Sequence, residues 1–234
     1  MNLSGKNIII TSGGTREYID DVRVLTNISS GKLGSMIADE CIKQEANVHY
    51  VYGKGAVLPD WFGSGSNLSM RRISTLQDLI DHLDQVHKNF VACGDKVDAV
   101  IMAIAASDFT FKRDGSVKLK SNDPEAFVEY MRKTITPNPK VITKIKDWWP
   151  DTFLVGFKFE VGLEHTDLIK TARTAMVKTR ADLTVANDKV EMNNANSHVG
   201  YLVTQESEEY CASKAAIVEQ LVGRLVINLN REPK

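Results

Sequence analysis

Several short segments of the chain carry side chains that can bind phosphate or neutralise negative charge. The first, ITSGGTREYIDDVRVLTNISSGKLG, contains a Gly-Gly pair, two arginines and Ser-Ser-Gly-Lys. Gly31 opens an expected helix, whose free N–H groups and positive dipole end favour an anion. Gly14 lets backbone approach a ligand closely, Ser29 and Ser30 can donate hydroxyls or cap the helix, and Arg16 and Arg23 add cations. The segment predicts an anion site; the structural alternative is a capped helix after a long turn.

This segment departs from two common nucleotide fingerprints. A P-loop needs GxxxxGK followed by Ser or Thr, but Gly31-Lys32 is followed by Leu33, and Thr26 stands at the first Gly position. The dinucleotide pattern GxGxxG is also missing after the first expected strand, where the chain reads SGGTRE. The connection is long for a compact domain, and such loops are often functional.

Three further segments could meet the first one. AIAASDF ends in Asp108, which can accept a hydrogen bond from a ribose or support a metal-bound phosphate, although Ser-Asp is commonly just a turn or a helix cap. In VKLKS, Lys118 and Lys120 face the same way if extended, although paired lysines are usually only solvated charges. TPNPKVI, residues 136–142, is a turn that starts a helix.

The elements that position these segments alternate between strands and helices. Strands are expected at 6–11, 47–52, 68–73, from 98, at 152–159, 181–188 and 198–203, and helices at 31–44, 76–91, 164–178 and 215–229. This alternation predicts an α/β fold, a Rossmann-like doubly wound and mainly parallel sheet. We expect one domain over residues 1–234.

Residues 110–136 interrupt the alternation. They contain charges, a turn at Asp114-Gly115, and the run PEAFVEYMRKTIT, which fits either a helix or an antiparallel excursion. An insertion directly after the carboxyl end of a strand lies where α/β proteins bind ligands. We expect a lid or a dimerisation arm.

Composition narrows the functional classes. The chain has 234 residues, 43% hydrophobic and 25% charged, with a net charge of -1, which gives no reason to expect a nucleic acid or an anionic membrane as partner. No stretch approaches the roughly 20 apolar residues that span a bilayer, and the N-terminus lacks a signal pattern. The three cysteines form no CxxC and the histidines are scattered, so we expect free thiols, a cytoplasmic location and no protein metal site.

Taken together and in order, GGTREYIDDVRVLTNISSGKLG, AASDF, KLKS, NPKVI, VGFKFE and DLTVAND resemble the phosphopantothenate–cysteine ligases. The chain looks like the separate, monofunctional bacterial form, which has no fused flavin-binding decarboxylase domain. The resemblance covers essentially the whole chain. It implies a Rossmann-like homodimer in which the partner subunit helps to form the site.

The resemblance also implies a reaction on the route to coenzyme A. The carboxylate of 4′-phosphopantothenate is activated with CTP, an acyl-cytidylate and pyrophosphate form, and the amine of cysteine then displaces CMP. Both nucleophiles arrive with the substrates, so the protein mainly aligns them and neutralises charge. Mg²⁺ is expected to be held mainly through the nucleotide, and no flavin is expected.

The same resemblance assigns roles to residues of this sequence. Asn27 and Lys118 are the catalytic candidates. The nucleotide-binding candidates are Asp108, Lys118, Lys120, Pro139, Lys140, Val141, Phe157 and Lys178. The phosphopantothenate-binding candidates are Gly14, Arg16, Arg23, Asn27, Ser29, Ser30, Gly31 and Ala105.

Two departures from the family pattern leave the nucleotide open between CTP and ATP. Ser121 stands at the last position of the family KxKK motif. Ala175 and Thr179 stand where many bacterial members have lysines, and Lys178 or Arg180 could take the place of those lysines.

Other functions also remain open. An NAD(P)-dependent oxidoreductase fits the expected fold, but the missing GxGxxG motif argues against it. A non-catalytic nucleotide-binding module would not need Asn27 and Lys118 together. A flavin-dependent decarboxylase is a further alternative, and its bound flavin would make the purified protein yellow.

Overall fold

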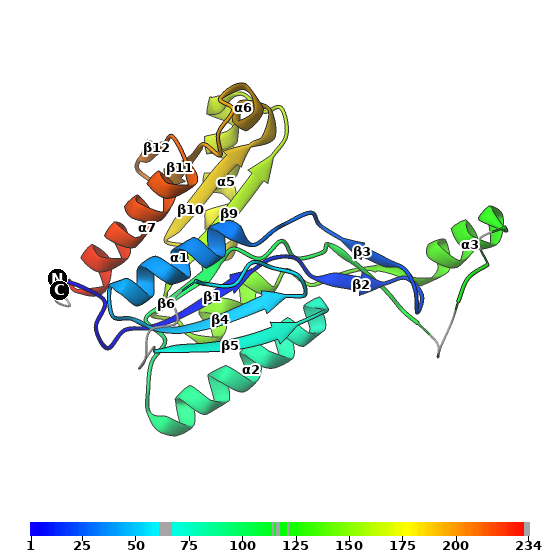
Figure 1. The fold of residues 1–234 in the computed structure, drawn as a ribbon, viewed down its shortest axis with the longest axis horizontal. Helices are drawn as coiled ribbons and strands as arrows, with labels where there is room; N and C mark the ends of the chain where they lie inside the picture. The colour runs from blue at the N-terminus through cyan, green and yellow to red at the C-terminus, as the bar shows by residue number, and fades with distance from the viewer. Residues whose placement is uncertain (61–66, 114, 116–117, 121, 232–234) are drawn as a thin grey trace.

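The centre of the fold is an eight-stranded sheet (Figure 1). The structure, a computed structural model, describes residues 1–60, 67–113, 115, 118–120 and 122–231. The strands of this sheet are β1 (Asn7–Ser12), β4 (Asn47–Gly53), β5 (Leu68–Ile73), β6 (Ala99–Met102), β9 (Phe153–Glu160), β10 (Leu183–Asp188), β11 (Gly200–Val203) and β12 (Glu208–Cys211). The helices are α1 (Lys32–Lys43), α2 (Leu76–Cys93), α3 (Pro124–Thr134), the 3-10 helix η1 (Val141–Lys144), α4 (Ile145–Trp148), α5 (His165–Thr179), α6 (Lys189–Asn194) and α7 (Lys214–Leu229).

The strand order is β12-β11-β10-β9-β6-β1-β4-β5. All pairs from β5 to β10 are parallel, and only β11 and β12 join antiparallel. The chain moves from β1 outward to β4 and β5, and then returns to the other side of β1 with β6. The direction in which the chain adds strands across the sheet therefore reverses between β1 and β6. Folds of this class bind ligands beyond the carboxyl ends of the strands at such a point. The predicted fold class is confirmed.

Helices cover both faces of the sheet because each central strand is buried on both sides. In β1 the side chains of Ile8 and Ile10 pack with α1 and α7, while Ile9 packs with α2 and α5 on the opposite face. This explains why the strand is a continuous apolar run rather than an alternating one. None of the described helices is both long and apolar enough to cross a membrane.

The long connection after β1 contains a hairpin that was not expected from the sequence. Its strands are β2 (Arg16–Tyr18) and β3 (Val24–Thr26), which pair antiparallel. Strands of three residues carry too little alternation to be predicted. The turn between them is held by Asp20, whose carboxylate accepts the N–H groups of Val22 and Arg23 at 2.8 and 2.6 Å.

The insertion forms an arm, which we define as β7 (Phe109–Phe111), α3, β8 (Ile135–Pro137) and the described residues between β7 and α3. β7 and β8 pair antiparallel outside the main sheet, and α3 lies at the far end, well away from the sheet (Figure 1). No residue of α3 is buried. The ambiguous run 124–136 is thus a helix followed by a short strand.

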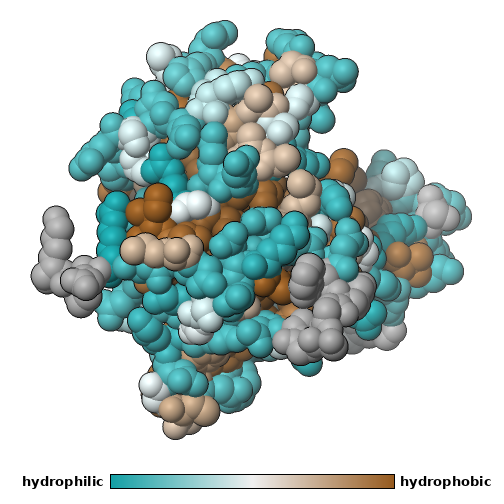
Figure 2. Space-filling view, turned by 60° about the vertical axis from the view of Figure 1, so that its left-hand side comes forward, coloured by the Kyte–Doolittle hydropathy of each residue, from teal (hydrophilic) through white to brown (hydrophobic). Residues whose placement is uncertain are grey.

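The face of the molecule in Figure 2 mixes hydrophilic and hydrophobic residues. On the arm, the exposed large hydrophobic side chains are Phe109, Val128 and Ile135. An isolated arm of this kind leaves apolar area uncovered. Its role as a lid or as a dimerisation arm stays a prediction.

Candidate active site

The first and second segments meet directly beyond the carboxyl ends of β1 and β6. The Ala105 N–H donates to the Gly13 carbonyl at 2.7 Å, and the Thr15 N–H donates to the Ala105 carbonyl at 3.4 Å. Gly14 and Ala105 form an isolated parallel bridge. Gly53, at the end of β4, packs so closely that a Cβ there would overlap the Gly14 carbonyl oxygen. Backbone at the ends of β1, β4 and β6 therefore meets in one place, which we call the floor.

Asn27 reaches across this floor from the end of the hairpin. Its side-chain N–H donates to the Ala106 carbonyl at 2.9 Å, and the residue is exposed. Thr26 holds the hairpin in place by donating to the Thr15 carbonyl at 2.7 Å. An amide carries two N–H groups, so the second remains to bind a ligand.

Asp108 is fastened to the segment that precedes η1. The Asn138 N–H donates to the Asp108 carbonyl at 2.8 Å, and its side-chain amide donates to the Ser107 carbonyl at 3.0 Å. The Lys140 ammonium forms an ion pair with the Asp108 carboxylate. Pro139 is exposed and Val141 is buried, so the Val141 side chain anchors the segment in the core. The structure thus brings Asn27, Ala105, Asp108 and Lys140 into one region.

The start of α1 lies at the same end of β1. The Ser29 and Ser30 hydroxyls are each 3.4 Å from a backbone N–H, those of Gly31 and Lys32, and no side chain caps the helix. Gly31 has a positive φ of 71°, which favours glycine. Residues 29–31, where we predict an anion site, therefore lie beside the floor.

The two candidate arginines differ in their surroundings. The Arg16 guanidinium donates to the Lys54 carbonyl at 3.0 Å and has no carboxylate partner in the described part of the chain. The Arg23 guanidinium is 2.5 Å from the buried carboxylate of Asp20. Arg16 is therefore free of charge pairing, whereas Arg23 is part of the hairpin turn.

Lys118 and Lys120 lie on the arm. Both are exposed, and neither is ion-paired with any residue that the structure describes. The residue between them, Leu119, is hydrogen-bonded to Asp20 and Arg23 of the hairpin. The hairpin therefore holds the backbone between the two lysines, and among the described residues no hydrogen bond or ion pair joins either lysine to Asn27 or Asp108.

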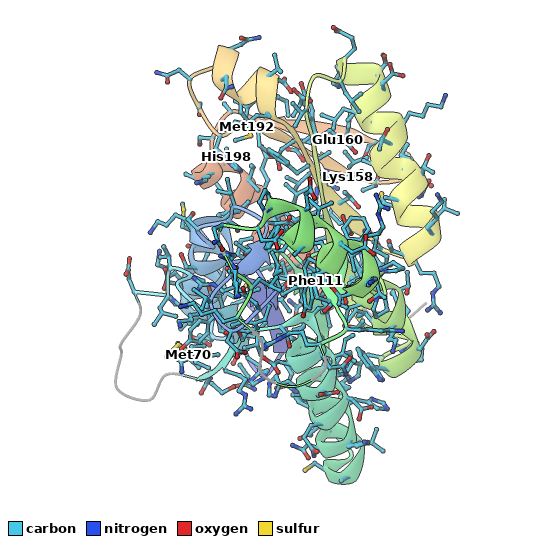
Figure 3. The ribbon with its side chains drawn as sticks, turned by 90° about the vertical axis from the view of Figure 1, so that its right-hand side faces the viewer. Met70, Phe111, Lys158, Glu160, Met192 and His198 are labelled. Atoms are coloured by element: carbon cyan, nitrogen blue, oxygen red, sulfur yellow. The ribbon has the colours of Figure 1, made fainter. Side chains whose placement is uncertain are left out.

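No hydrogen bond or ion pair joins Phe157 or Lys178 to another candidate in the described part of the chain. Phe157 is partly buried in β9 and packs against the core under α1 and α7. It is followed by the ion pair between Lys158 and Glu160, at 2.7 Å, which marks the end of the strand in Figure 3. Lys178 is exposed in the last turn of α5 and contacts none of the other candidates within the described residues.

Two buried carboxylates support this region and were missed from the sequence. Glu17 in β2 accepts the Leu76 N–H at 2.8 Å and the Thr110 hydroxyl at 2.9 Å, so it joins the hairpin to α2 and to β7. Asp188 accepts the Val190 and Leu163 N–H groups at 2.8 and 3.0 Å. Burial alone would raise the pKa of Asp188, but its backbone hydrogen bonds outweigh this and lower it. The available signal was weak, because Glu17 stands between Arg16 and Tyr18 and Asp188 is the last residue of DLTVAND.

Among the described residues, no group of three or more His, Cys, Asp or Glu side chains could hold a metal ion. The turn after β1 is also closely packed, since a Cβ at Gly13 would lie 2.6 Å from the Ala56 Cβ. That turn is where a Rossmann fold receives the pyrophosphate of a dinucleotide. In this chain the space beside Gly13 is filled by Ala56.

Comparison with known proteins identifies relatives of this chain. The chain is 37% identical over 186 residues to the coenzyme A biosynthesis bifunctional protein CoaBC of Thermococcus kodakarensis, which covers 80% of this chain and 42% of that protein. It is 27% identical over 223 residues to the protein of the same name from Methanocaldococcus jannaschii, covering 94% of this chain and 50% of that protein. The chain thus spans about half, or less, of the length of the curated relatives it matches.

A solved structure and a family comparison extend the match. The crystal structure of the DNA/pantothenate metabolism flavoprotein from Streptococcus pneumoniae superposes with a TM-score of 0.80 at 27% identity, covering 95% of this chain and 99% of that one. The family described as the DNA/pantothenate metabolism flavoprotein C-terminal domain matches residues 3–228. The chain therefore belongs to the family of the DNA/pantothenate metabolism flavoprotein C-terminal domain.

Proposed function

We propose that this protein is a phosphopantothenate–cysteine ligase that joins 4′-phosphopantothenate to L-cysteine in coenzyme A biosynthesis, with CTP as the activating nucleotide. The observation that carries the proposal is the hydrogen bond from Asn27 to Ala106, which places a donor amide beside the Asp108–Lys140 pair at the switch point of the sheet. Family membership supports it, as do the names of the two relatives, which are coenzyme A biosynthesis proteins.

In the first half-reaction, a carboxylate oxygen of 4′-phosphopantothenate attacks the α-phosphorus of CTP. The bond from that phosphorus to the oxygen that bridges to the β-phosphorus breaks, and pyrophosphate leaves. Negative charge grows on the leaving group, and a cation beside it lowers the barrier. Lys118 and Lys120 are exposed cations on the arm, without a carboxylate partner among the described residues, and so are suited to this role.

In the second half-reaction, the cysteine amine attacks the acyl carbon, the bond to CMP breaks, and the amine loses a proton. Negative charge develops on the acyl oxygen. One N–H of Asn27 is used to hold the amide against Ala106, and the other donates to that oxygen. A donor fixed in advance is more effective than a mobile one because it does not have to reorganise during the reaction.

The phosphopantothenate site follows from the floor of the crevice. Gly14 and Ala105 present backbone to the pantothenate chain, and Ser29, Ser30 and Gly31 offer hydroxyl and N–H donors beside it. For the distal phosphate we favour Arg16, because Arg23 is already paired with Asp20.

The nucleotide site lies on the other side of Asp108. Asp108 accepts from the ribose, the backbone of Pro139, Lys140 and Val141 reads the base, and Phe157 lines the pocket. Lys178 is kept as a nucleotide contact because Arg180, two residues later, donates to the Thr143 carbonyl of η1 at 3.0 Å. Mg²⁺ would be held mainly by the triphosphate and water. We assign no step to flavin or nicotinamide.

The assembly we propose is a homodimer joined through the arms, whose apolar side chains Phe109, Val128 and Ile135 are exposed in the single chain. The partner's arm then completes each site. All three cysteines are free, which suits the reducing cytoplasm. We propose that the chain forms a single ligase domain.

The test is a reaction with defined components. The purified chain is incubated with CTP, Mg²⁺ and 4′-phosphopantothenate, with and without cysteine, and pyrophosphate and 4′-phosphopantothenoylcysteine are measured. An absorbance scan of the same sample tests for flavin, and added NAD(P)⁺ tests for hydride transfer. Pyrophosphate release that requires 4′-phosphopantothenate supports the ligase; a yellow protein or hydride transfer supports the alternatives.

A further inference from the structure

Asp20 joins two segments that are far apart in the sequence. Its side chain is fully buried in the turn between β2 and β3, and its carboxylate accepts the N–H of Leu119, 99 residues away, at 3.2 Å. It also accepts the Val22 and Arg23 N–H groups. Burial alone would raise the pKa of Asp20, but these hydrogen bonds and the Arg23 charge together lower it, so the group is ionised at neutral pH.

Arg23 completes the contact from the same turn. Its guanidinium lies 2.5 Å from the Asp20 carboxylate and donates to the Leu119 carbonyl at 3.3 Å. Both backbone groups of Leu119 are therefore held by the hairpin. Arg113, earlier on the arm, forms an ion pair with Asp21 of the same turn. The connection between β7 and α3 is fastened to the hairpin at two points.

The contacts of Leu119 with the hairpin also affect the lysines on either side of it. Leu119 is half-buried, whereas Lys118 and Lys120 are exposed. This is the pattern of an extended segment lying on a surface, in which alternate side chains point away from it. Fixing Leu119 thus fixes the point from which both lysines project.

We propose that Asp20 is a positioning residue, which holds the Leu119 backbone so that Lys118 reaches the leaving pyrophosphate from a fixed place. The proposal rests on the function proposed above for Lys118. A charged group that stabilises a transition state is effective when its supporting residues keep it within a fraction of an ångström of the productive position. Asp20 acts through Lys118 and touches no substrate.

The test compares Asp20→Asn with Asp123→Asn in pyrophosphate release, alone and combined with Lys118→Gln. Asp123 is the matched control because its carboxylate accepts a backbone N–H on the same arm, that of Ala126, without touching Leu119. We expect Asp20→Asn to lower kcat at least tenfold in the original chain and less than twofold in the Lys118→Gln chain, and Asp123→Asn to lower it less than twofold. Equal losses in both backgrounds would show that Asp20 stabilises the fold without acting through Lys118.

A second pair of variants leaves the turn intact. Leu119→Pro removes the N–H that Asp20 accepts, while Leu119→Ala keeps it and shortens only the side chain. We expect a loss of tenfold or more in kcat for Leu119→Pro and less than threefold for Leu119→Ala. Equal effects of the two variants would overturn the proposal, and this comparison remains decisive if Asp20→Asn does not fold.

Trypsin gives a readout that does not depend on the ligase reaction. Cleavage after Lys118 and Lys120, followed by mass spectrometry, should become at least fivefold faster in Asp20→Asn, while cleavage after Lys88 on α2 stays unchanged. An unchanged rate after Lys118 and Lys120 would overturn the proposed hold on the segment. If the original chain releases no pyrophosphate but this cleavage difference is found, the proposed function fails while the hold of Asp20 on the arm stands.

Discussion

The side chain of Asn27 donates a hydrogen bond to the Ala106 carbonyl at 2.9 Å, although 79 positions separate the two residues in the sequence. This bond joins the hairpin after β1 to the strand end after β6. It uses one of the two N–H groups of the amide and leaves the other for a ligand. The ligase mechanism proposed above depends on this arrangement more than on any other.

The first prediction concerns Asn27→Asp. The carboxylate would repel both the Ala106 carbonyl and the negative charge that develops on the acyl oxygen. We expect acyl-cytidylate to form and to react poorly with cysteine, so that it accumulates and is detected by mass spectrometry. Asn228→Asp on α7 is the control, because Asn228 also donates to a backbone carbonyl, that of Arg224, at 2.8 Å. Loss of acyl-cytidylate formation in Asn27→Asp alone would assign Asn27 to the first half-reaction instead.

The second prediction concerns Lys118→Gln, which keeps most of the length of the side chain and removes its charge. Pyrophosphate release should fall about a hundredfold or more, a loss typical of one electrostatic donor. Lys133→Gln on α3 is the control, since Lys133 is exposed and pairs only with Glu129, at 3.2 Å, in the described part of the arm. Similar rates for the two variants would remove Lys118 from the mechanism.

The third prediction concerns the nucleotide. CTP should support faster turnover than ATP, because the backbone at Pro139–Val141 presents a fixed pattern of donors and acceptors to a pyrimidine edge. The segment is held by the Asn138 contacts to Ser107 and Asp108 and by the Arg180 contact to Thr143. Initial rates with each nucleotide at equal concentration measure the preference. Equal or faster turnover with ATP would contradict this assignment.

The fourth prediction concerns the arm. Light scattering at micromolar concentration should give about twice the 26.0 kDa of one chain, because the proposed dimer would cover the exposed apolar side chains of the arm. Val128→Asp should shift the mass towards a single chain and lower activity with it. Val177→Asp on α5 is the control, since Val177 is also an exposed valine but lies outside the arm. A fully active single chain would contradict a shared site.

The fifth prediction concerns acid stability. His49 on β4 and His82 on α2 lie with their Nε2 atoms 2.7 Å apart, and burial together with the His82 charge lowers the pKa of His49 to about 4. The unfolded chain therefore binds more protons than the folded chain as pH falls from 6.5 to 4, so stability falls over this range. In His49→Gln the loss of unfolding free energy between pH 6.5 and pH 4 should therefore be smaller, by on the order of 2 kcal/mol. His82 and His198, whose pKa values are also lowered by burial, leave a residual slope. An unchanged slope in His49→Gln would contradict the prediction.

Much of the fold was predictable because most helices and strands carry a long, regular pattern of apolar residues that are buried in the core. The apolar run of β1, the spacing in α7 and the strand–helix alternation each reflect packing against one core. The hairpin β2–β3 and the strand β12 were missed because runs of three or four residues carry little periodic signal. The antiparallel pairing of β11 was also missed, since direction depends on the following connection rather than on the strand itself.

The roles assigned to the site residues stay predictions, and the structure shows where these residues lie. The motifs around Asn27 and Asp108 pointed to phosphate and nucleotide chemistry, and the structure brings them to one strand edge. The partnership of Asp20 with Leu119 was not predictable, because no local pattern links residues 99 positions apart. Arg23 looked like a substrate cation from its type, whereas its position beside Asp20 gives it a structural partner.

The most direct measurement of the central claim is pyrophosphate release from CTP by the purified chain, with 4′-phosphopantothenate present and cysteine left out. The account predicts release only when 4′-phosphopantothenate is present, with a matching amount of acyl-cytidylate that cysteine then converts to 4′-phosphopantothenoylcysteine and CMP. Release of pyrophosphate without 4′-phosphopantothenate, or no release in its presence, would contradict it.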